Sequence, residues 1–297
     1  MFRIAKRLIL FFAVNLLIIL TLSFTLNILG VRPYLDARGI NYSSLMIFCL
    51  VWGMGGAFIS LALSRITAKW MMGVSVIDPN TSDSDLSWLV NTVHKLARSA
   101  GLSKMPEVGI YDSPEINAFA TGPTRNRSLV AVSAGLLENM NKEQIEGVLA
   151  HEVAHISNGD MVTMTLLQGI INAIVMFLAR IIAYVVVSRR NSDDDSPSLR
   201  YFVTFVLEII LSFLGMIVVA AFSRYREYRA DAGGASLAGR EKMISALKAL
   251  LKTVRYADLT GKESIASFKI SGTPKFMKLF STHPPLEERI ERLERGF

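Results

Sequence analysis

Residues 141–160 read NKEQIEGVLAHEVAHISNGD, and this stretch decides how the surrounding chain folds. Asn141 is a residue type that caps helices, acidic residues follow in the first turns, and apolar residues then recur on one face. The pattern predicts an amphipathic α-helix. Its polar first half is unsuited to hydrocarbon, so we expect the helix to lie in a domain outside the membrane.

The predicted helix carries the motif His-Glu-x-x-His at residues 151–155. The two histidines are about 6 Å apart along the axis and share one face, so both imidazoles can reach one tetrahedral Zn²⁺. Glu152 is then expected to be the general base that takes a proton from a zinc-activated water attacking a peptide carbonyl. The alternative is a pair of surface histidines. Two of the chain's four histidines lie in this motif on a predicted helix, which favours the metal site.

A catalytic zinc needs a third protein ligand, and the extended motif does not supply one because position 158 is Asn and position 161 is Met. The best candidate is Glu227, within the segment REYRAD. Asp231 follows one helical turn later and could hold a ligand imidazole through its second nitrogen. An ordinary charged helix face explains the same residues. Spacing alone does not decide between these interpretations.

The composition indicates membrane segments, because 51% of the residues are apolar and only 19% are charged, against about 25% charged in soluble domains. No charge occurs between Arg7 and Arg32 or between Arg38 and Arg65. Each run exceeds the ~20 residues needed to cross a bilayer. A cleaved signal peptide would need a shorter apolar core and a small-residue cleavage site, which are not evident. We therefore expect a transmembrane helix pair within residues 1–69.

The distribution of basic residues predicts the orientation of this pair. Five basic residues flank it on the outer sides and two lie in the connecting loop, which favours a cytoplasmic location for everything after Lys69. The only cysteine, Cys49, lies in an apolar run, so no intrachain disulfide is possible. The net charge is +7, but the sequence contains no basic stretch interleaved with aromatic residues. We expect no nucleic-acid partner and attribute the charge to anchoring at anionic lipid.

The remaining segments predict a mixed α+β domain interrupted by a second apolar region. Before the motif we expect a linker over 70–84, a helix over 86–100 with Gly101 at its cap, and a small sheet or hairpin. After the motif we expect helices over 224–240 and 241–255, irregular chain over 257–281, and a short charged helix at the end. The strands of the sheet are expected at Val108–Tyr111, Asn117–Thr121 and Leu129–Val132. The chain is thus expected to divide into four parts: the transmembrane pair 1–69, the protease part with the motif helix 70–160, the hydrophobic hairpin 161–223 and the C-terminal helical part 224–297.

Residues 161–223 predict a hydrophobic helical hairpin. A polar turn around Asp194 would place Arg180 and Glu208 at similar depth on antiparallel helices, where a bilayer would require them to pair. The alternative is a hairpin partly buried in protein. Basic residues in the turn argue mildly against a spanning hairpin.

Three segments together resemble the HtpX family of membrane metalloproteases, which is related to the CAAX prenyl endopeptidases. They are HEVAHISNGD, the downstream REYRADAG and the late THPPLEERI, and the resemblance covers essentially the whole chain. It implies a predominantly α membrane protein with a zincin-like metalloprotease domain and one Zn²⁺ per chain. Glu227 matches the family's third zinc ligand, and Asp231 matches its aspartate behind a ligand histidine. The resemblance also implies quality control of damaged or misfolded membrane proteins.

Other polar residues are candidates for supporting roles. His283 could stabilise the oxyanion, and Arg289 could orient that segment or contact substrate carbonyls, although a structural turn before a helix explains both. Asn117 lies on a predicted edge strand to which an extended peptide could add, unless that strand is simply part of the core. Asp160 either forms a hydrogen bond to a metal-binding residue and holds it in place, or is simply a polar residue at the end of the helix. His94 is expected at the surface.

The predicted function is zinc-dependent endoproteolysis at the cytoplasmic face of the cell inner membrane. Both ligand segments run almost directly into apolar stretches, so we expect polypeptide substrates that emerge from the bilayer or lie against it. An intramembrane-cleaving metalloprotease and a non-catalytic zinc-binding scaffold are the alternatives. The scaffold would not require Glu152. The sequence does not indicate an oligomeric state.

Overall fold

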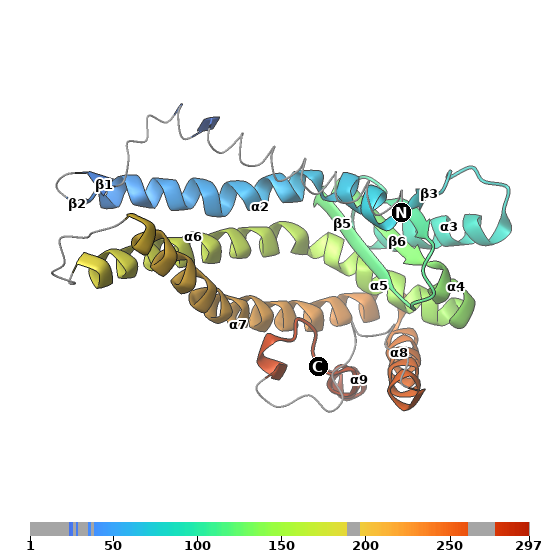
Figure 1. The fold of residues 1–297 in the computed structure, drawn as a ribbon. Helices are drawn as coiled ribbons and strands as arrows, with labels where there is room; N and C mark the ends of the chain where they lie inside the picture. Colours follow the sequence, from blue (N-terminus) through green and yellow to red (C-terminus); the bar gives the residue numbers. More distant parts are fainter. Residues whose placement is uncertain are drawn as a thin grey trace. The chain divides into compact units, whose positions relative to one another are not determined.

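The computed structural model describes residues 39–188, 197–260 and 277–296, together with Phe24, Thr25, Ile28, Leu35 and Asp36 (Figure 1). The first predicted transmembrane helix therefore lies almost wholly outside the described residues. The chain divides into two compact units. One contains the chain up to Leu61 together with Met164–Val219, and the other contains Ala62–Thr163 and Ala220–Phe297.

Within the described part of the chain, three helices are long and apolar enough to cross a membrane: α2 (Tyr42–Met72), α6 (Asp160–Ser188) and α7 (Pro197–Ala238). In the first unit, α2 and α6 pack through a small cluster that includes Leu45, Cys49 and Ala173. Two-residue strands, β1 (Leu35–Asp36) and β2 (Gly39–Ile40), pair just before α2. The expectation of a predominantly helical membrane protein is confirmed.

Arg180 on α6 and Glu208 on α7 form the predicted ion pair. Arg180 Nη1 lies 2.6 Å from Glu208 Oε1 and also donates to the carbonyl of Met176 at 3.0 Å. Both charges sit in long apolar segments, where an isolated charge is costly and a matched pair offsets the penalty. The two helices are therefore held in a register that brings these side chains together.

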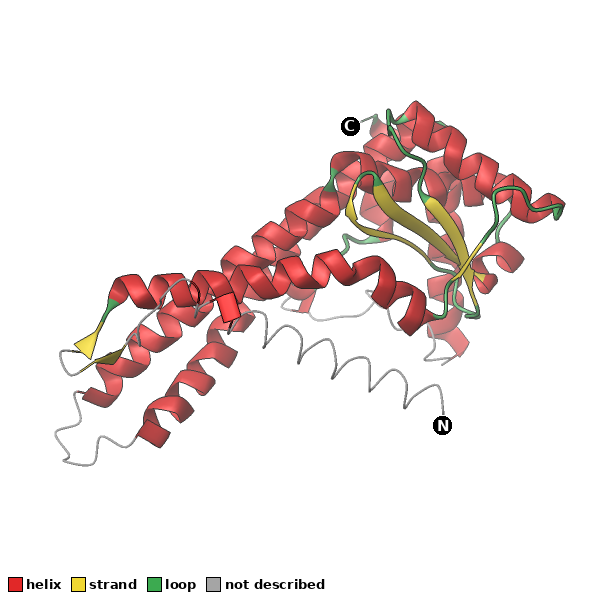
Figure 2. Cartoon of the chain, turned by 90° about the horizontal axis from the view of Figure 1, so that it is seen from above, coloured by secondary structure: helices red, strands yellow, loops and turns green. Residues whose placement is uncertain are grey.

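The second unit contains a four-stranded sheet in the order β3-β4-β6-β5 (Figure 2). β4 (Glu107–Tyr111) runs parallel to β6 (Arg127–Ser133), while β5 (Ala118–Thr124) pairs antiparallel with β6 and forms one edge. The three predicted strands are confirmed. β3 (Ser75–Val76) pairs with β4, so the expected linker over 70–84 contains a strand too short to give a periodic signal.

The remaining helices of the second unit include those that pack against the sheet and build its core. They are α3 (Ser84–Ser99), α4 (Ala134–Asn139), α5 (Lys142–Asn158), α8 (Arg240–Thr260), the 3₁₀ helix η2 (Met277–Phe280) and α9 (Leu286–Arg295). The sequence did not predict α4. The expected irregular region from 257 also begins too early, because α8 continues to Thr260.

The motif helix α5 has well-defined ends. Asn141 and Gln144 form a reciprocal capping box at its start, and Gly159 closes it in the left-handed conformation with φ 72°. Of its two motif histidines, His151 is 8% exposed and His155 is 7% exposed. The helix is therefore fixed at both ends and buried along the face that carries the histidines.

Glycines allow other helices to approach α5 closely. A Cβ atom added at Gly147 would lie 2.6 Å from the carbonyl oxygen of Lys242 on α8. One added at Gly234 on α7 would lie 3.1 Å from the backbone nitrogen of His151, and one at Gly233 would lie 2.8 Å from Cβ of Ala154. The spacing between α5 and its neighbours thus depends on the absence of side chains at these positions.

Candidate metal centre

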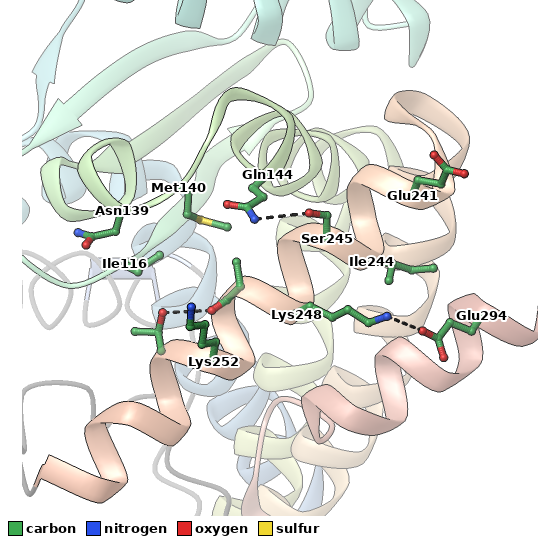
Figure 3. A pocket seen from close by; sticks show the side chains of 12 residues that line it. Ile116, Asn139, Met140, Gln144, Glu241, Ile244, Ser245, Lys248, Lys252 and Glu294 are labelled. Atoms are coloured by element: carbon green, nitrogen blue, oxygen red, sulfur yellow. Dashed lines mark hydrogen bonds and ion pairs between the residues drawn. The ribbon is translucent and has the colours of Figure 1, made fainter.

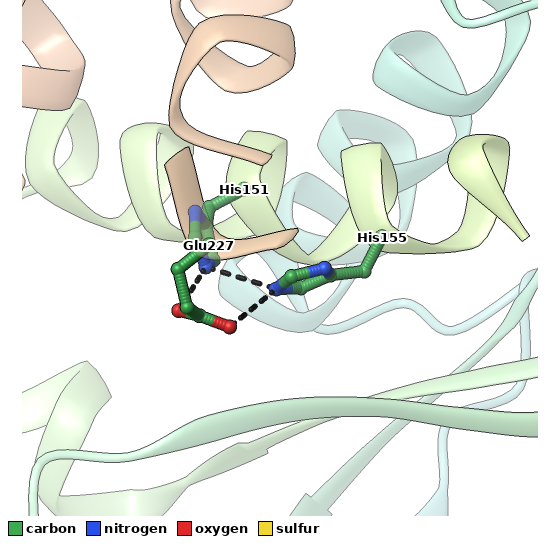
Figure 4. Close-up of side chains that lie close together, drawn as sticks. All are labelled: His151, His155 and Glu227. Atoms are coloured by element: carbon green, nitrogen blue, oxygen red, sulfur yellow. Dashed lines mark hydrogen bonds and ion pairs between the residues drawn. The ribbon is translucent and has the colours of Figure 1, made fainter. Parts of the chain in front are cut away.

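Three potential metal ligands converge between α5 and α7, as Figure 4 shows. His151 Nε2 and His155 Nε2 are 3.1 Å apart. The Glu227 carboxylate lies 3.4 Å from the first of these nitrogens and 3.3 Å from the second. All three side chains are buried, and Glu227 is only 1% exposed. The sequence therefore named a set of residues that the fold brings together.

The carboxylate partners of the two imidazoles leave both Nε2 atoms available to a cation. His151 Nδ1 lies 3.0 Å from Asp231 Oδ1, and His155 Nδ1 lies 2.6 Å from Asp160 Oδ2. An ionised carboxylate only accepts hydrogen bonds, so each Nδ1 carries a proton and each neutral ring has its lone pair on Nε2. Two lone pairs facing each other at 3.1 Å repel unless a positive charge separates them.

The dimensions of the site fit zinc. Ligands about 2.1 Å from a tetrahedral zinc lie about 3.4 Å from one another, close to the separations among these three ligands. In addition, Glu227 Oε2 is buried and accepts no hydrogen bond of good geometry from the described residues, although His283 Nδ1 lies 2.9 Å away. A buried carboxylate oxygen left in this way is suited to a metal. Two imidazoles and one carboxylate are a typical set for catalytic zinc.

A proton would occupy part of this site in the metal-free protein. Burial lowers the pKa of His151, but its hydrogen bonds to Asp231 and Glu227 outweigh burial and raise that pKa to about 9. Burial raises the pKa of Glu227, but the adjacent imidazoles of His151, His155 and His283 hold that pKa far below the usual range. The site therefore strongly favours positive charge at its centre.

Asp231 is held in turn by Arg289 on α9. Arg289 donates from Nε to Oδ2 at 2.8 Å and from Nη2 to Oδ1 at 2.6 Å. Burial raises the pKa of Asp231, yet the adjacent guanidinium lowers it to about 2. The third guanidinium nitrogen, Nη1, lies 3.6 Å from Glu227 Oε2. Arg289 is thus buried behind the histidine and the carboxylate, with two of its donors committed to Asp231.

We expect Arg289→Met to destabilise the protein by about 3–5 kcal/mol, because the buried Asp231 carboxylate would lose its partner. Thermal denaturation of the detergent-purified protein measures this effect. The matched control is Arg255→Met, because Arg255 forms an exposed pair with Glu287 and should cost less than about 1 kcal/mol. Adding Asp231→Asn to Arg289→Met should restore part of the stability. Equal denaturation temperatures for the two single variants would contradict the assignment.

We expect Asp160→Asn to weaken zinc binding by about 10- to 100-fold, since Asp160 fixes the tautomer and the orientation of His155. Competition with a chromophoric chelator measures the affinity. Asp85→Asn is the control, because Asp85 is an exposed acid at the start of α3 that pairs with Lys142. An unchanged affinity in the Asp160 variant would show that this residue serves only the helix end.

A cavity of about 380 Å³ opens beside the three ligands, and four other expected site residues line it: Asn117, Glu152, His283 and Arg289. Glu152 and His283 line it, and His283 is the more accessible of the site residues with a side chain 45% exposed. Asn117 and the first residues of β5 form another wall, so the edge strand of the sheet borders the cavity. His94 is half-buried elsewhere, with Nε2 3.2 Å from the carbonyl oxygen of Pro106.

Two arginines near the site were not predicted from the sequence. Arg226 lines the cavity and donates from Nη2 to Glu227 Oε1 at 3.1 Å. Arg224 donates to the carbonyl oxygens of Leu279 and Ser281, which lie just before His283. The hydroxyl of Ser281 in turn donates to the carbonyl oxygen of His283 at 2.6 Å. In the sequence, only their position one and three residues before Glu227 could have indicated that these arginines lie near the site. The partners of Arg224 gave no local pattern, because they are more than fifty residues away in the chain.

Two histidines on one helix and a carboxylate from a second helix form the cluster that a metalloendopeptidase needs. Together with the long apolar helices, they define the class of membrane metalloendopeptidases. The chain belongs to Peptidase family M48, whose model matches residues 83–296. Curated relatives named "Protease HtpX homolog" align over nearly their whole length, which confirms the resemblance noted from the motifs.

Two of these relatives illustrate the similarity. The protein from Bacillus velezensis is 52% identical over 298 residues, covering 98% of this chain and 99% of the relative. The protein from Thiobacillus denitrificans is 50% identical over 291 residues, covering 97% and 98%. Among solved structures, the crystal structure of S. mikatae Ste24p matches with a TM-score of 0.67 and 17% identity. The match covers 98% of this chain but only 64% of that one, and it concerns the fold.

Proposed function

We propose that this protein is a zinc-dependent endopeptidase that cleaves misfolded or damaged membrane proteins at the cytoplasmic face of the cell inner membrane. The observation that carries the proposal is the pair of imidazole Nε2 atoms, 3.1 Å apart, which face a buried carboxylate in the cavity that also contains Glu152. Membership of Peptidase family M48 and the HtpX relatives support the reaction type.

His151, His155 and Glu227 hold the zinc in this proposal. When bound, zinc polarises the substrate carbonyl and lowers the pKa of the attacking water towards neutrality. A carboxylate oxygen of Glu152 accepts the proton of that water and later passes it to the nitrogen of the leaving amine. Glu152 lines the same cavity as the ligands, which is the position that this role requires.

The other cavity residues bind and orient the substrate. His283 donates a hydrogen bond to the oxyanion that forms at the attacked carbonyl, and Arg224 holds the segment that carries it. Arg289 positions Asp231, and through it His151. It also lines the cavity, where we assign its remaining donor, Nη1, to contacts with substrate carbonyls. Asn117 and β5 offer an edge to which an extended peptide adds as a further strand.

The membrane supplies the substrates in this proposal. α7 is one continuous helix, and Glu227 follows the end of its apolar part at Ser223 by only four residues, or about 6 Å. We expect a site that follows so closely on the apolar part of α7 to meet chain segments that emerge from the bilayer. Hydrogen bonds between a strand edge and the backbone of an extended peptide depend little on the side chains of the peptide. Such binding therefore suits the cleavage of unfolded chains with diverse sequences.

The first experiment is zinc add-back. The detergent-purified protein is prepared with a chelator and then incubated with an unfolded membrane protein, with and without added zinc. We expect cleavage only in the zinc-loaded sample, with one zinc bound per chain. Stoichiometric zinc binding without cleavage of any offered substrate would instead support a zinc-binding scaffold.

The orientation can be tested with introduced cysteines, because the only native cysteine, Cys49, is buried. Asn41 and Ser82 are exposed and lie before and after α2. Asn41→Cys should react with an impermeant thiol reagent in intact cells, and Ser82→Cys should react only after the cells are opened. The reverse pattern would place the active site on the outer face.

A further inference from the structure

A second, open cavity of about 890 Å³ lies beside the metal cavity and has no role in the mechanism above (Figure 3). We call it the α8 groove. Met140 lines it from the segment that joins α4 to α5, and Gln144 lines it from the first turn of α5. Ile244 and Lys252 line it from α8, and Glu294 lines it from α9. Its floor is partly apolar, and its rim is charged.

The α8 groove and the metal cavity share parts of their walls. Ile116 lines both cavities. They also share α8 as a wall, because Ala246 and Leu250 face the metal cavity while Ser245 and Ala249, each one residue earlier, face the groove. A polypeptide that leaves the metal cavity past Ile116 would therefore meet the α8 groove.

The direction of β5 indicates which end of the substrate takes this path. Ile116 lies just before β5 begins at Ala118. A peptide that adds antiparallel to β5 runs in the opposite direction, so its residues C-terminal to the scissile bond lie towards Ile116. These residues then continue into the groove.

The charges in the groove differ in how they are paired. Lys248 donates to Glu294 at 2.8 Å across the groove. Lys252 is exposed and forms no ion pair with any residue of the described part of the chain. Figure 3 places Lys252 on the same side as Ile116, with Glu241 at the opposite end of α8. The unpaired cation is therefore at the end of the groove that lies towards Ile116.

We propose that the α8 groove binds the part of the substrate that is C-terminal to the scissile bond, and that Lys252 selects there for a carboxylate. The carboxylate is either an acidic side chain or the C-terminus of the chain. This inference rests on the proposed function, because it assigns a specificity to the same active site.

The test uses the full-length, zinc-loaded protein and a set of quenched fluorescent peptides. One set carries a single Asp or Lys at each of the first five positions after the scissile bond, with an amidated C-terminus. A second set lacks acidic side chains and ends, at those positions, in either a free carboxylate or an amide. The variants are Lys252→Gln, Lys252→Glu and, as the control with the same charge change on α3, Lys95→Glu.

We expect the parent to cleave the Asp peptide about two- to fivefold faster than the Lys peptide in kcat/KM at one of these positions, as for a partly exposed ion pair. Added salt should reduce the preference. Lys252→Gln should abolish it, Lys252→Glu should invert it, and Lys95→Glu should keep it. A preference for the free carboxylate in the second set would identify the chain terminus as the preferred group.

A parent that cleaves all peptides equally, or a preference that persists in Lys252→Glu, would overturn this inference and leave the proposed function intact. A parent that binds zinc but cleaves none of the peptides, nor the unfolded membrane protein, would overturn both. The two failures are therefore distinguishable in one set of measurements.

Discussion

Glu152→Gln is expected to reduce peptide cleavage on the order of 10³-fold while leaving bound zinc unchanged. The amide has nearly the same shape as the carboxylate but cannot accept the proton of the attacking water. Glu152 is outside the cluster of metal ligands, so its charge is not needed to hold the ion. Cleavage of the unfolded membrane protein and zinc content should be measured on the same preparation.

Glu143→Gln is the matched control for this prediction. Glu143 is an exposed carboxylate in the first turn of the same helix, and its loss should change neither zinc content nor cleavage. If the Glu152 variant keeps near-normal activity, another group is the base. If it keeps both its zinc and its function in the cell without cleavage, the protein acts as a scaffold.

Glu227→Gln is expected to remove most of the bound zinc and, with it, proteolysis. The substitution replaces a buried anion by a neutral amide between two imidazole lone pairs. The loss of affinity should exceed the ~10- to 100-fold that follows removal of a hydrogen-bond partner behind a ligand. Zinc content after dialysis against a weak chelator, followed by the cleavage assay with excess zinc, measures both effects.

The control here is Glu146→Gln, a partly buried carboxylate on α5 that pairs with Lys242 at 2.6 Å, away from the ligands. It should keep its zinc and its activity even if its stability falls. Circular dichroism of both variants separates metal loss from unfolding. A Glu227 variant that retains one zinc per chain at ordinary affinity would mean that a different residue completes the site.

The part of the site that the sequence could predict was the part with a local pattern. Two histidines four residues apart on an amphipathic helix define a metal-binding face without any knowledge of the fold. The pair Arg180–Glu208 was also predictable, because two apolar runs joined by a polar turn leave few registers in which both charges are partnered. In each case a strong periodicity limited the possible geometry.

The rest depended on contacts between distant segments. Arg289 and Asp231 are 58 residues apart, and their charges could equally belong to two solvated helix faces. Spacing left the role of Glu227 undecided for the same reason, and the family resemblance was needed to choose it. β3 and α4 were missed because two and six residues are too few to show a period.

The glycines that allow α7 and α8 to pack closely against α5 affect how the activity of the protein depends on the zinc concentration. A methyl group at position 234 would press on the backbone of His151, and one at position 147 would press on Lys242. The ligands would all remain, but α5 would shift relative to Glu227 and hold zinc less tightly. We therefore expect such a protein to need a higher free zinc concentration than the parent to reach the same activity.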